Sequence, residues 1–541
     1  MAKRTFSPSR AMRRFGFRQT IRGALIIGVL SGLMMGAQGA AYAAAYPNQK
    51  DRDAFVTSLS SVPALGFMAG EAKNALLPAS YSIYKSIALT TLLAAIWGLM
   101  TTTRLLRGQE EDGRLEPILA GRTTKMAASL HILIGYGYSF VIAIVISWAA
   151  IAALGLDPQV DLSIGHAGLL SLGVFLPGLF FASLGVLTSQ LALTRGRALA
   201  YGLGVLLFLF TLRGAANSIT DWNGWKHFSP FGWTDLLNPV LDPQLIWILP
   251  TLAFTIIVIP LALFFAKQRD LGESVLPESQ FARSHFYLLG SDFGYSIRQN
   301  IWPFIWWTLG AIAYAGLLSS IAKVGADALS SSPAFVKIVS TLGGNHDDIV
   351  ISFLGLGGMF TALILLVMSA VSIGSIRRQE AKGYLDTILV QPIHRSAWLT
   401  KRLIILAVMV LAISLIASYT IWQIAENTGV SLDLWIILQN GTTLVGSVLL
   451  LIGAGALLYG VLPRLAAIVM YVAIVWGFVV DVLKSFLTLD DSIDKTSLLH
   501  YATFTPTKTP DWETFTWLLG IGIFLAALGV WRFAKRDIVN E

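Results

Sequence analysis

The chain has 541 residues, of which 55% are hydrophobic and only 13% are charged, and its mean hydropathy is +0.67. This composition lies far from the average of soluble proteins and predicts a polytopic membrane protein. The absence of cysteine excludes disulfide bonds, cysteine metal sites and a thiol nucleophile. Membrane topology is the first explanation of the net charge of +8, and nucleic acid is not expected as a partner.

Runs of about twenty apolar residues recur along the chain, and each is long enough to cross about 30 Å of hydrocarbon as a helix. The first run follows seven basic residues, an arrangement that also fits a secretory signal peptide. A matching run after residues 293–298 favours a retained span. We expect spans at about 24–45, 84–103, 126–154, 165–193, 198–215, 246–266, 299–321, 349–374, 401–422, 436–460, 465–488 and 514–533.

A charged segment after the second predicted span occurs twice. Residues 107–119 (RGQEEDGRLEPIL) and 377–389 (RRQEAKGYLDTIL) are identical at seven of thirteen positions. Their separation of 270 residues is close to half the chain, which predicts two tandem copies of one plan, residues 1–270 and 271–541. The sequence AKQRDL closes the first copy and AKRDI closes the second.

The distribution of positive charge predicts the orientation. If both termini and the repeated segment are cytoplasmic, 28 of the 39 Lys and Arg residues lie inside. Six spans in each copy give both copies the same orientation, so the repeats are parallel about an axis along the membrane normal. The predicted fold is therefore an all-α polytopic membrane protein of about twelve helices, with both termini cytoplasmic.

The repeated segment is too charged to cross the membrane, so it lies at the surface or contacts a soluble partner. Its apolar residues recur at i, i+3 and i+4, which predicts a short helix with one apolar face. These residues are Leu115, Ile118 and Leu119 in the first copy and Leu385, Ile388 and Leu389 in the second.

Each predicted helix has a glycine before it and an acid in its first turn. Gly113 and Gly383 permit a backbone bend with positive φ. Glu116 and Asp386 place a carboxylate where the helix dipole favours it. A simpler interpretation is two amphipathic loops on anionic lipid, but lipid contact does not require identical residues at a fixed separation.

Residues 380–395 (EAKGYLDTILVQPIHR) directly follow an apolar span and resemble the loop after the second span of ABC-2 type exporter permeases. In that family the loop forms a coupling helix that docks on the ATPase. The duplicated layout further resembles the fused, two-half permeases of polyketide-antibiotic (tetronasin-type) exporters. This resemblance implies ATPase-coupling roles for Glu110, Gly113, Leu115, Glu116, Leu119, Glu380, Gly383, Leu385, Asp386, Leu389, Pro392 and Arg395.

The first copy departs from the family pattern. Arg122 stands where the pattern has proline, and Pro117 lies inside the predicted helix. We therefore expect the first docking site to be bent or weaker than the second.

The chain contains no Walker motif, since residues 121–125 (GRTTK) lack the second glycine and the loop length that cradle phosphates. We therefore expect no ATPase activity on this chain and no bound cofactor. The resemblance implies two copies of a separate ABC ATPase subunit on the cytoplasmic side, which would hold ATP and Mg²⁺. The histidines are scattered without companions at ligand spacing, so no metal site is expected.

The resemblance thus implies the permease subunit of an ATP-binding cassette exporter in a bacterial cell membrane, driven by ATP that the separate subunits hydrolyse. Its substrate would be a hydrophobic or amphipathic compound such as an antibiotic, drug or lipid-like molecule, which implies multidrug efflux and antibiotic resistance. The alternative is an ion-coupled secondary transporter with twelve spans, which needs titratable residues at mid-depth that these spans nearly lack. A membrane-embedded transferase is a third hypothesis, and it needs a clustered acid/base set. The direction of transport follows from the resemblance alone.

Overall fold

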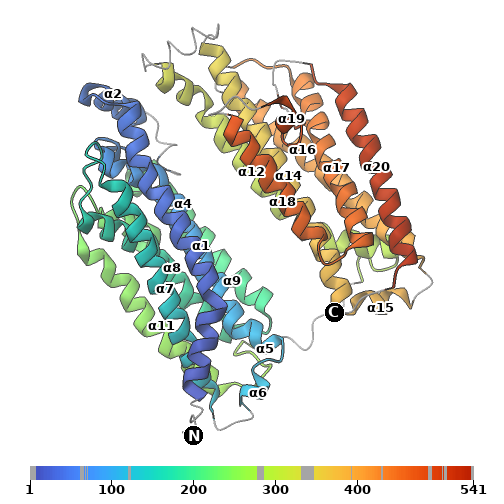
Figure 1. Ribbon diagram of the computed structural model, residues 1–541, viewed down its shortest axis with the longest axis horizontal. Coiled ribbons are helices and arrows are strands. Elements are labelled where there is room, and N and C mark those ends of the chain that lie inside the picture. The colour runs from blue at the N-terminus through green and yellow to red at the C-terminus, as the bar shows by residue number, and fades with distance from the viewer. Residues whose placement is uncertain are drawn as a thin grey trace. The chain divides into compact units, whose positions relative to one another are not determined.

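The computed structural model describes residues 8–60, 66, 69, 71–119, 123–276, 286–330, 346–390, 393–427, 430–484, 490–502, 504 and 509–537. Within these ranges the regular elements are helices and none is a strand, as the sequence predicts (Figure 1). The chain divides into two compact units, Met1–Ala282 and Arg283–Glu541. The sequence repeat places the boundary between the two copies after residue 270. The boundary between the two compact units lies after residue 282.

The first unit is a bundle in which α1 packs against α4 and α7, α4 packs against α8, and α8 packs against α11. A short π-helical turn, η2, joins α4 to the repeated segment. The elements are α1 (Pro8–Ala45), α2 (Gln49–Ser60), η1 (Ala72–Ala75), α4 (Pro78–Thr103), η2 (Arg104–Gly108), α5 (Gln109–Glu111), α6 (Glu116–Leu119), α7 (Lys125–Gly155), α8 (Ile164–Leu191), α9 (Arg195–Ser218), η3 (Thr220–Phe228), α10 (Pro230–Leu237), η4 (Leu245–Ile248) and α11 (Leu249–Gln268).

The second unit has the same order of packing, because α12 packs against α14 and α16, α14 against α17, and α17 against α20. The helices α12, α14, α16, α17 and α20 thus correspond to α1, α4, α7, α8 and α11. The elements are α12 (Asp292–Ser330), α14 (His346–Ala381), α15 (Tyr384–Leu389), α16 (Arg395–Asn427), α17 (Leu434–Val461), α18 (Ala466–Lys484), α19 (Asp491–Asp494) and α20 (Trp512–Lys535).

Ten helices in the described part of the chain are long and apolar enough to cross a membrane. They coincide with ten of the twelve predicted spans, and the chain is a polytopic membrane protein. The other two predicted spans fall in α12, which is not among the ten, and in α18, whose apolar stretch Ala466–Val480 is shorter. Twelve spans in two repeats therefore stay a prediction.

The helix starts follow local sequence rules. The side chains of Thr124, Ser163 and Thr194 accept a backbone N–H at the starts of α7, α8 and α9. Asp433 and Asp511 do the same at the starts of α17 and α20. Such caps satisfy backbone donors that the first turn leaves free, so the polar residues between the apolar runs fix where these helices begin.

Glycines allow α1 to lie very close to α7. A Cβ on Gly16 would lie 2.2 Å from the carbonyl oxygen of Ile132, and one on Gly135 would lie 2.1 Å from that of Arg13. Small residues of this kind permit close contact between helices where lipid provides no hydrophobic drive. Within the apolar run that also resembled a signal peptide, a Cβ on Gly28 would lie 2.8 Å from the carbonyl oxygen of Ala143, so this run is closely packed in the first unit.

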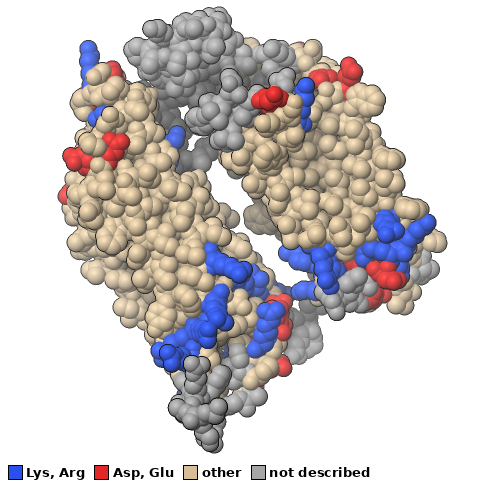
Figure 2. All heavy atoms as spheres, viewed as in Figure 1, with Lys and Arg blue, Asp and Glu red and all other residues tan. Residues whose placement is uncertain are grey.

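Basic side chains gather at one end of each unit taken by itself. In the first unit this end carries α5 and α6, and in the second it carries α15 (Figures 1 and 2). The repeated segment therefore lies, in both units, at the more basic end of the bundle. This is the side that the distribution of positive charge predicts to be cytoplasmic.

Candidate functional site

The repeated segment makes the same bend in both units. Gly113 has φ of +69° and Gly383 has φ of +72°. Their N–H groups donate to the carbonyl oxygens of Glu110 and Glu380, at 3.0 and 2.9 Å. Because this left-handed region favours glycine, the predicted role of the two glycines as bends is confirmed.

The helices after the bends are short and unequal. α15 has six residues, whereas α6 has four and contains Pro117 at its second position. Leu115 and Leu385 are buried, and Leu119 and Leu389 pack partly buried against the cores of their units. The predicted apolar face therefore points into the unit that carries it.

Two of the residues that the sequence selected for this helix are not fully described. The side chain of Ile118 and the whole of Pro392 lie outside the described residues. Ile388 in the second unit is partly buried against the core, on the face shared with Leu385.

The acids in the first turns of α6 and α15 lie on the surface. Glu116 and Asp386 are both exposed, as their predicted positions at the helix starts require. Around them, Tyr384 is 57% exposed and Val390 is 87% exposed. In the first unit, the exposed neighbours of Glu116 are Arg114 and Pro117.

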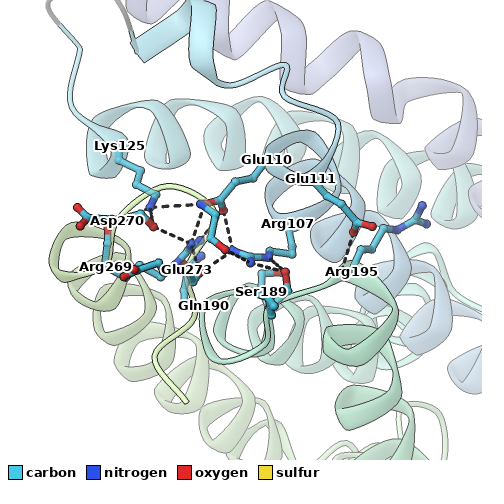
Figure 3. A network of polar contacts seen from close by, with 12 residues as sticks. Arg107, Glu110, Glu111, Lys125, Ser189, Gln190, Arg195, Arg269, Asp270 and Glu273 are labelled. Atoms are coloured by element: carbon cyan, nitrogen blue, oxygen red, sulfur yellow. Dashed lines mark hydrogen bonds and ion pairs between the residues drawn. The ribbon is translucent and has the colours of Figure 1, made fainter. Parts of the chain in front are cut away.

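Glu110, by contrast, lies inside the first unit, with a side chain only 4% exposed. Arg269 donates from Nη1 to Oε1 of Glu110 at 2.7 Å and from Nη2 to Oε2 at 2.6 Å (Figure 3). The N–H of Gly272 donates to Oε1 at 2.9 Å. Arg107 and Lys125 lie 3.2 and 3.6 Å from the carboxylate oxygens. We call this cluster the first clamp.

The cations of the first clamp are held by backbone oxygens and one amide. Arg269 donates from Nε to Oε1 of Gln190 at 2.9 Å and from Nη1 to the carbonyl of Glu273 at 2.7 Å. Arg107 donates to the same carbonyl at 2.9 Å, and Lys125 donates to the carbonyl of Arg269 at 3.1 Å. The first clamp thus joins the ends of α4, α7, α8 and α11.

Glu380 has the corresponding place in the second unit, and its side chain is fully buried. Arg536 donates from Nη1 to Oε1 at 2.6 Å and from Nη2 to Oε2 at 2.8 Å. The hydroxyl of Tyr459 donates to Oε2 at 2.7 Å, and Arg377 lies 3.7 Å away. Arg395 donates to the carbonyl of Arg536 at 3.1 Å, as Lys125 does to that of Arg269. We call this cluster the second clamp.

The guanidinium of Arg536 is held by rings as well as by charge. It lies over the rings of Tyr459 and Phe533, with centroid distances of 5.0 and 5.1 Å. Burial lowers the pKa of Arg536, but hydrogen bonds and attraction from Glu380 outweigh it and raise the pKa above its ordinary value. This arginine therefore stays charged, and the pair is a two-pronged, charge-assisted contact.

The structure thus separates residues that the sequence grouped together. Glu116 and Asp386 are exposed on the surface, whereas Glu110 and Glu380 are buried in ion pairs inside their units. Their role in ATPase coupling stays a prediction, and burial requires that they act by holding the segment in place. Removing one member of a buried ion pair typically costs about 3 to 5 kcal/mol, because the other charge is left uncompensated.

Sequence reasoning missed the arginines and the tyrosine that complete the clamps. Arg269 and Arg536 each directly follow the last helix of their unit, α11 and α20. The signal was the Arg-Asp pair that closes both copies, which we interpreted only as a repeat boundary. Tyr459 has no counterpart, since residue 189 is serine, and the comparison of copies gave no sign of it.

Two comparisons with known proteins bear on this site. Residues 289–534 match the family model described as "Multidrug efflux system permease Rv1217c, C-terminal domain". Over 511 residues the chain is 27% identical to "Multidrug efflux system permease protein Rv1217c" of Mycobacterium tuberculosis (strain ATCC 25618 / H37Rv), covering 91% of this chain and 88% of that protein. The region matched by the family model contains Glu380 and Tyr459 of the second clamp and ends before Arg536. The longer match makes the chain similar to an efflux permease over most of its length.

Proposed function

We propose that this chain is the membrane subunit of an ABC exporter, built from two parallel repeats of six spans. It moves a hydrophobic or amphipathic compound out of a bacterial cell, with ATP and Mg²⁺ bound by two copies of a separate ATPase subunit. Similarity to a multidrug efflux permease supports the efflux role. The ABC-2 type and the tetronasin-like layout rest on the resemblance of residues 380–395 and on the duplicated segment.

The observation that carries the ATPase coupling is the clamp that occurs in both units. In each, a glutamate just before the glycine bend is gripped in two-pronged fashion by the arginine that follows the last long helix. A segment that only rests on lipid needs no such link. A segment that transmits the motion of a soluble partner needs a rigid connection to the membrane spans. Buried ion pairs of this geometry provide such a connection.

The surface that meets the ATPase is then the exposed side of α6 and α15. Tyrosine and aliphatic side chains at the second site suit a packed protein contact better than the charged and proline side chains at the first. Two copies of one ATPase would therefore meet two unequal surfaces. These surfaces consist of Arg114, Glu116 and Pro117 in the first unit and Tyr384, Asp386 and Val390 in the second.

In the proposed mechanism, nucleotide binding closes the ATPase dimer and displaces α6 and α15. Because the clamps fix the segment to α4 and α11 in one unit and to α14 and α20 in the other, these helices move with it. The movement would open the pathway alternately to the two sides of the membrane. In this mechanism the membrane subunit transmits the motion to its spans, and the ATPase subunits hydrolyse the ATP.

The function is tested by transport in inverted membrane vesicles from cells that express the chain with a candidate ATPase. We expect uptake of a lipophilic dye that is blocked by vanadate and unaffected by a protonophore, and co-purification of the ATPase with the chain. If a protonophore abolishes uptake and vanadate does not inhibit it, the result supports the ion-coupled alternative instead. Vesicles with an ATPase inactivated in its Walker motif provide the control.

A further inference from the structure

A groove of about 300 Å³ lies between α12 and α16 in the second unit. Its one polar lining side chain among the described residues, Asn300, donates to the carbonyl of Ser296 at 2.8 Å, so its amide group is used within α12. The remainder of the lining is apolar. It includes Ile297, Ile301 and Phe304 from α12 and Ile404, Val408 and Ala412 from α16.

The corresponding crossing in the first unit is tightly packed. Gly16 and Gly135 bring the backbones of α1 and α7 into contact, and Gly28 lies against Ala143 in the same way. α12 and α16 run parallel and come close further along, where a Cβ on Gly316 would lie 3.3 Å from Cδ1 of Ile424. The cavity is therefore a local opening between two helices that pack together elsewhere.

This cavity is open on the surface of a predicted membrane span. Ile404 is 52% exposed and Val408 is 61% exposed, and both lie within the candidate span Arg395–Asn427. An exposed groove on the side of a membrane span is a place where a lipid acyl chain can lie. Its apolar lining suits an alkyl chain and offers almost no hydrogen bonds to anything else.

One end of the groove is polar and basic. There, Lys401 of α16 donates to Oδ2 of Asp292 at the start of α12, at 3.0 Å, and the lysine side chain is 37% exposed. The next residue, Arg402, is buried and lies over the ring of Trp398 at 4.5 Å. Its Nη1 donates to Gln379, while Nε and Nη2 have no hydrogen-bond partner among the described residues. Arg402 is also near enough to Asp292 to be attracted by it, so two cations share this carboxylate.

We propose that this groove binds one acyl chain of an anionic membrane phospholipid, with the phosphate of the headgroup at Lys401. The apolar groove suits the acyl chain, and its opening along the span lets the chain lie beside the helices. The surplus cation at the end of the span suits the phosphate. Basic sites between membrane helices bind anionic headgroups, and each lysine near the surface favours them by about five-fold. The first unit, with its groove closed by glycine packing, holds no lipid at the equivalent place.

Native mass spectrometry of the full chain, released from nanodiscs of phosphatidylcholine with a minority of phosphatidylglycerol, tests the proposal. We expect one phosphatidylglycerol to stay bound through a delipidating wash. Val408→Trp and Ala412→Trp fill the groove and should lose it. Val141→Trp, at a position of α7 that is 58% exposed, is the matched control and should keep it. Lys401→Gln should keep a lipid but reduce the preference for phosphatidylglycerol about five-fold.

The proposal is overturned if the groove-filling variants retain the lipid as the wild type does, or if the control variant loses it as well. It is also overturned if the retained molecule is a small amphiphile and not a phospholipid. Thermal unfolding of each variant shows whether it is folded.

A second measurement needs no variant. Phosphatidylglycerol with a diazirine in its acyl chain is photo-crosslinked to the unmodified protein, and excess unlabelled lipid is added as a chase. Chase-resistant adducts on residues 293–304 and 404–412 support the site, and chase-resistant adducts confined to other spans contradict it.

Discussion

The two clamps hold the same carboxylate with different chemistry. Glu110 is surrounded by Arg269, Arg107 and Lys125 and accepts the N–H of Gly272. Among the described residues, Glu380 accepts from Arg536 and from the hydroxyl of Tyr459, and Arg377 lies 3.7 Å away. The described contacts of the first clamp are therefore mainly between charges, whereas those of the second also include a phenol and ring stacking.

The comparison shows which parts of the arrangement the proposed function requires. The glutamate, the glycine bend and the arginine after the last helix occur in both units, whereas the other partners differ. The arginine is supported differently as well. Nε of Arg269 donates to Gln190, but residue 460 is glycine and Nε of Arg536 has no partner among the described residues. The effect of these different partners on stability should be measurable.

The largest expected effect is that of Arg536→Ala. It removes the two-pronged contact from a carboxylate that is fully buried, so we expect a loss of about 3 to 5 kcal/mol in the free energy of unfolding. Arg269→Ala should lose less, about 1 to 3 kcal/mol, because Arg107, Lys125 and the N–H of Gly272 remain. Unfolding by SDS titration in mixed micelles measures both.

A double variant provides the control for this pair. Glu380→Gln combined with Arg536→Gln removes both charges, so it should be less destabilising than Arg536→Ala alone. Equal losses from Arg536→Ala and Arg269→Ala would show that the two clamps do not differ in redundancy.

Tyr459→Phe comes next and probes the phenol that only the second clamp has. Removing a hydroxyl that donates to a buried carboxylate at 2.7 Å should cost about 2 kcal/mol. The ring remains, so its stacking with Arg536 is kept. Tyr136→Phe is the matched control, because its buried hydroxyl has no hydrogen-bond partner among the described residues. The same SDS titration compares them, and a neutral result at Tyr459 would remove the phenol from the second clamp.

The proposed docking surfaces give a smaller effect, on binding and not on stability. Tyr384→Ala should weaken binding of the ATPase by about 1.5 kcal/mol, roughly tenfold, because exposed tyrosines at packed contacts carry much of the binding energy. Arg114→Ala, at the equivalent place in the first unit, should weaken it less, since an exposed charge at a rim contributes little. Binding to the chain in nanodiscs measures both, and Tyr419→Ala, 49% exposed on α16, is the control.

The order of these two docking variants decides whether the second surface is the stronger one. If Arg114→Ala weakens binding more than Tyr384→Ala, the first surface dominates despite its proline and its shorter helix. If Tyr419→Ala has the same effect as Tyr384→Ala, the loss of binding is not specific to α15.

The sequence predicted the local features of the site because they depend on local rules. Positive φ at Gly113 and Gly383 follows from a glycine placed between a helix end and an apolar helix start. The exposure of Glu116 and Asp386 follows from the period of the apolar residues. In contrast, the pairing of Glu110 with Arg269 joins residues 159 apart and depends on how α11 packs against α8 and α7. The cavity beside α16 depends on such packing too, and no spacing in the sequence predicts it.

The smallest expected effect is the same in both units, and it separates backbone conformation from the clamp partners. Gly113→Ala and Gly383→Ala add a Cβ where φ is positive, which costs about 1 kcal/mol for an L residue. No atom lies within 4 Å of a Cβ built at Gly113, and the nearest at Gly383 is Oδ2 of Asp386 at 4.0 Å, so steric contact adds nothing. The two losses should therefore agree within error.

Gly137→Ala is the control for the glycine bends. It lies inside α7, also with nothing within 4 Å of its Cβ, but its φ is not positive, so alanine should be neutral or stabilising there. The SDS titration used for the clamps measures all three variants. If Gly383→Ala cost several times more than Gly113→Ala, the bend would be coupled to the second clamp, since backbone strain at Gly383 would then displace Glu380 from its two-pronged contact with Arg536. Equal losses would mean that the bend is set by conformation alone and that the inequality of the two units begins at the side chains around each glutamate.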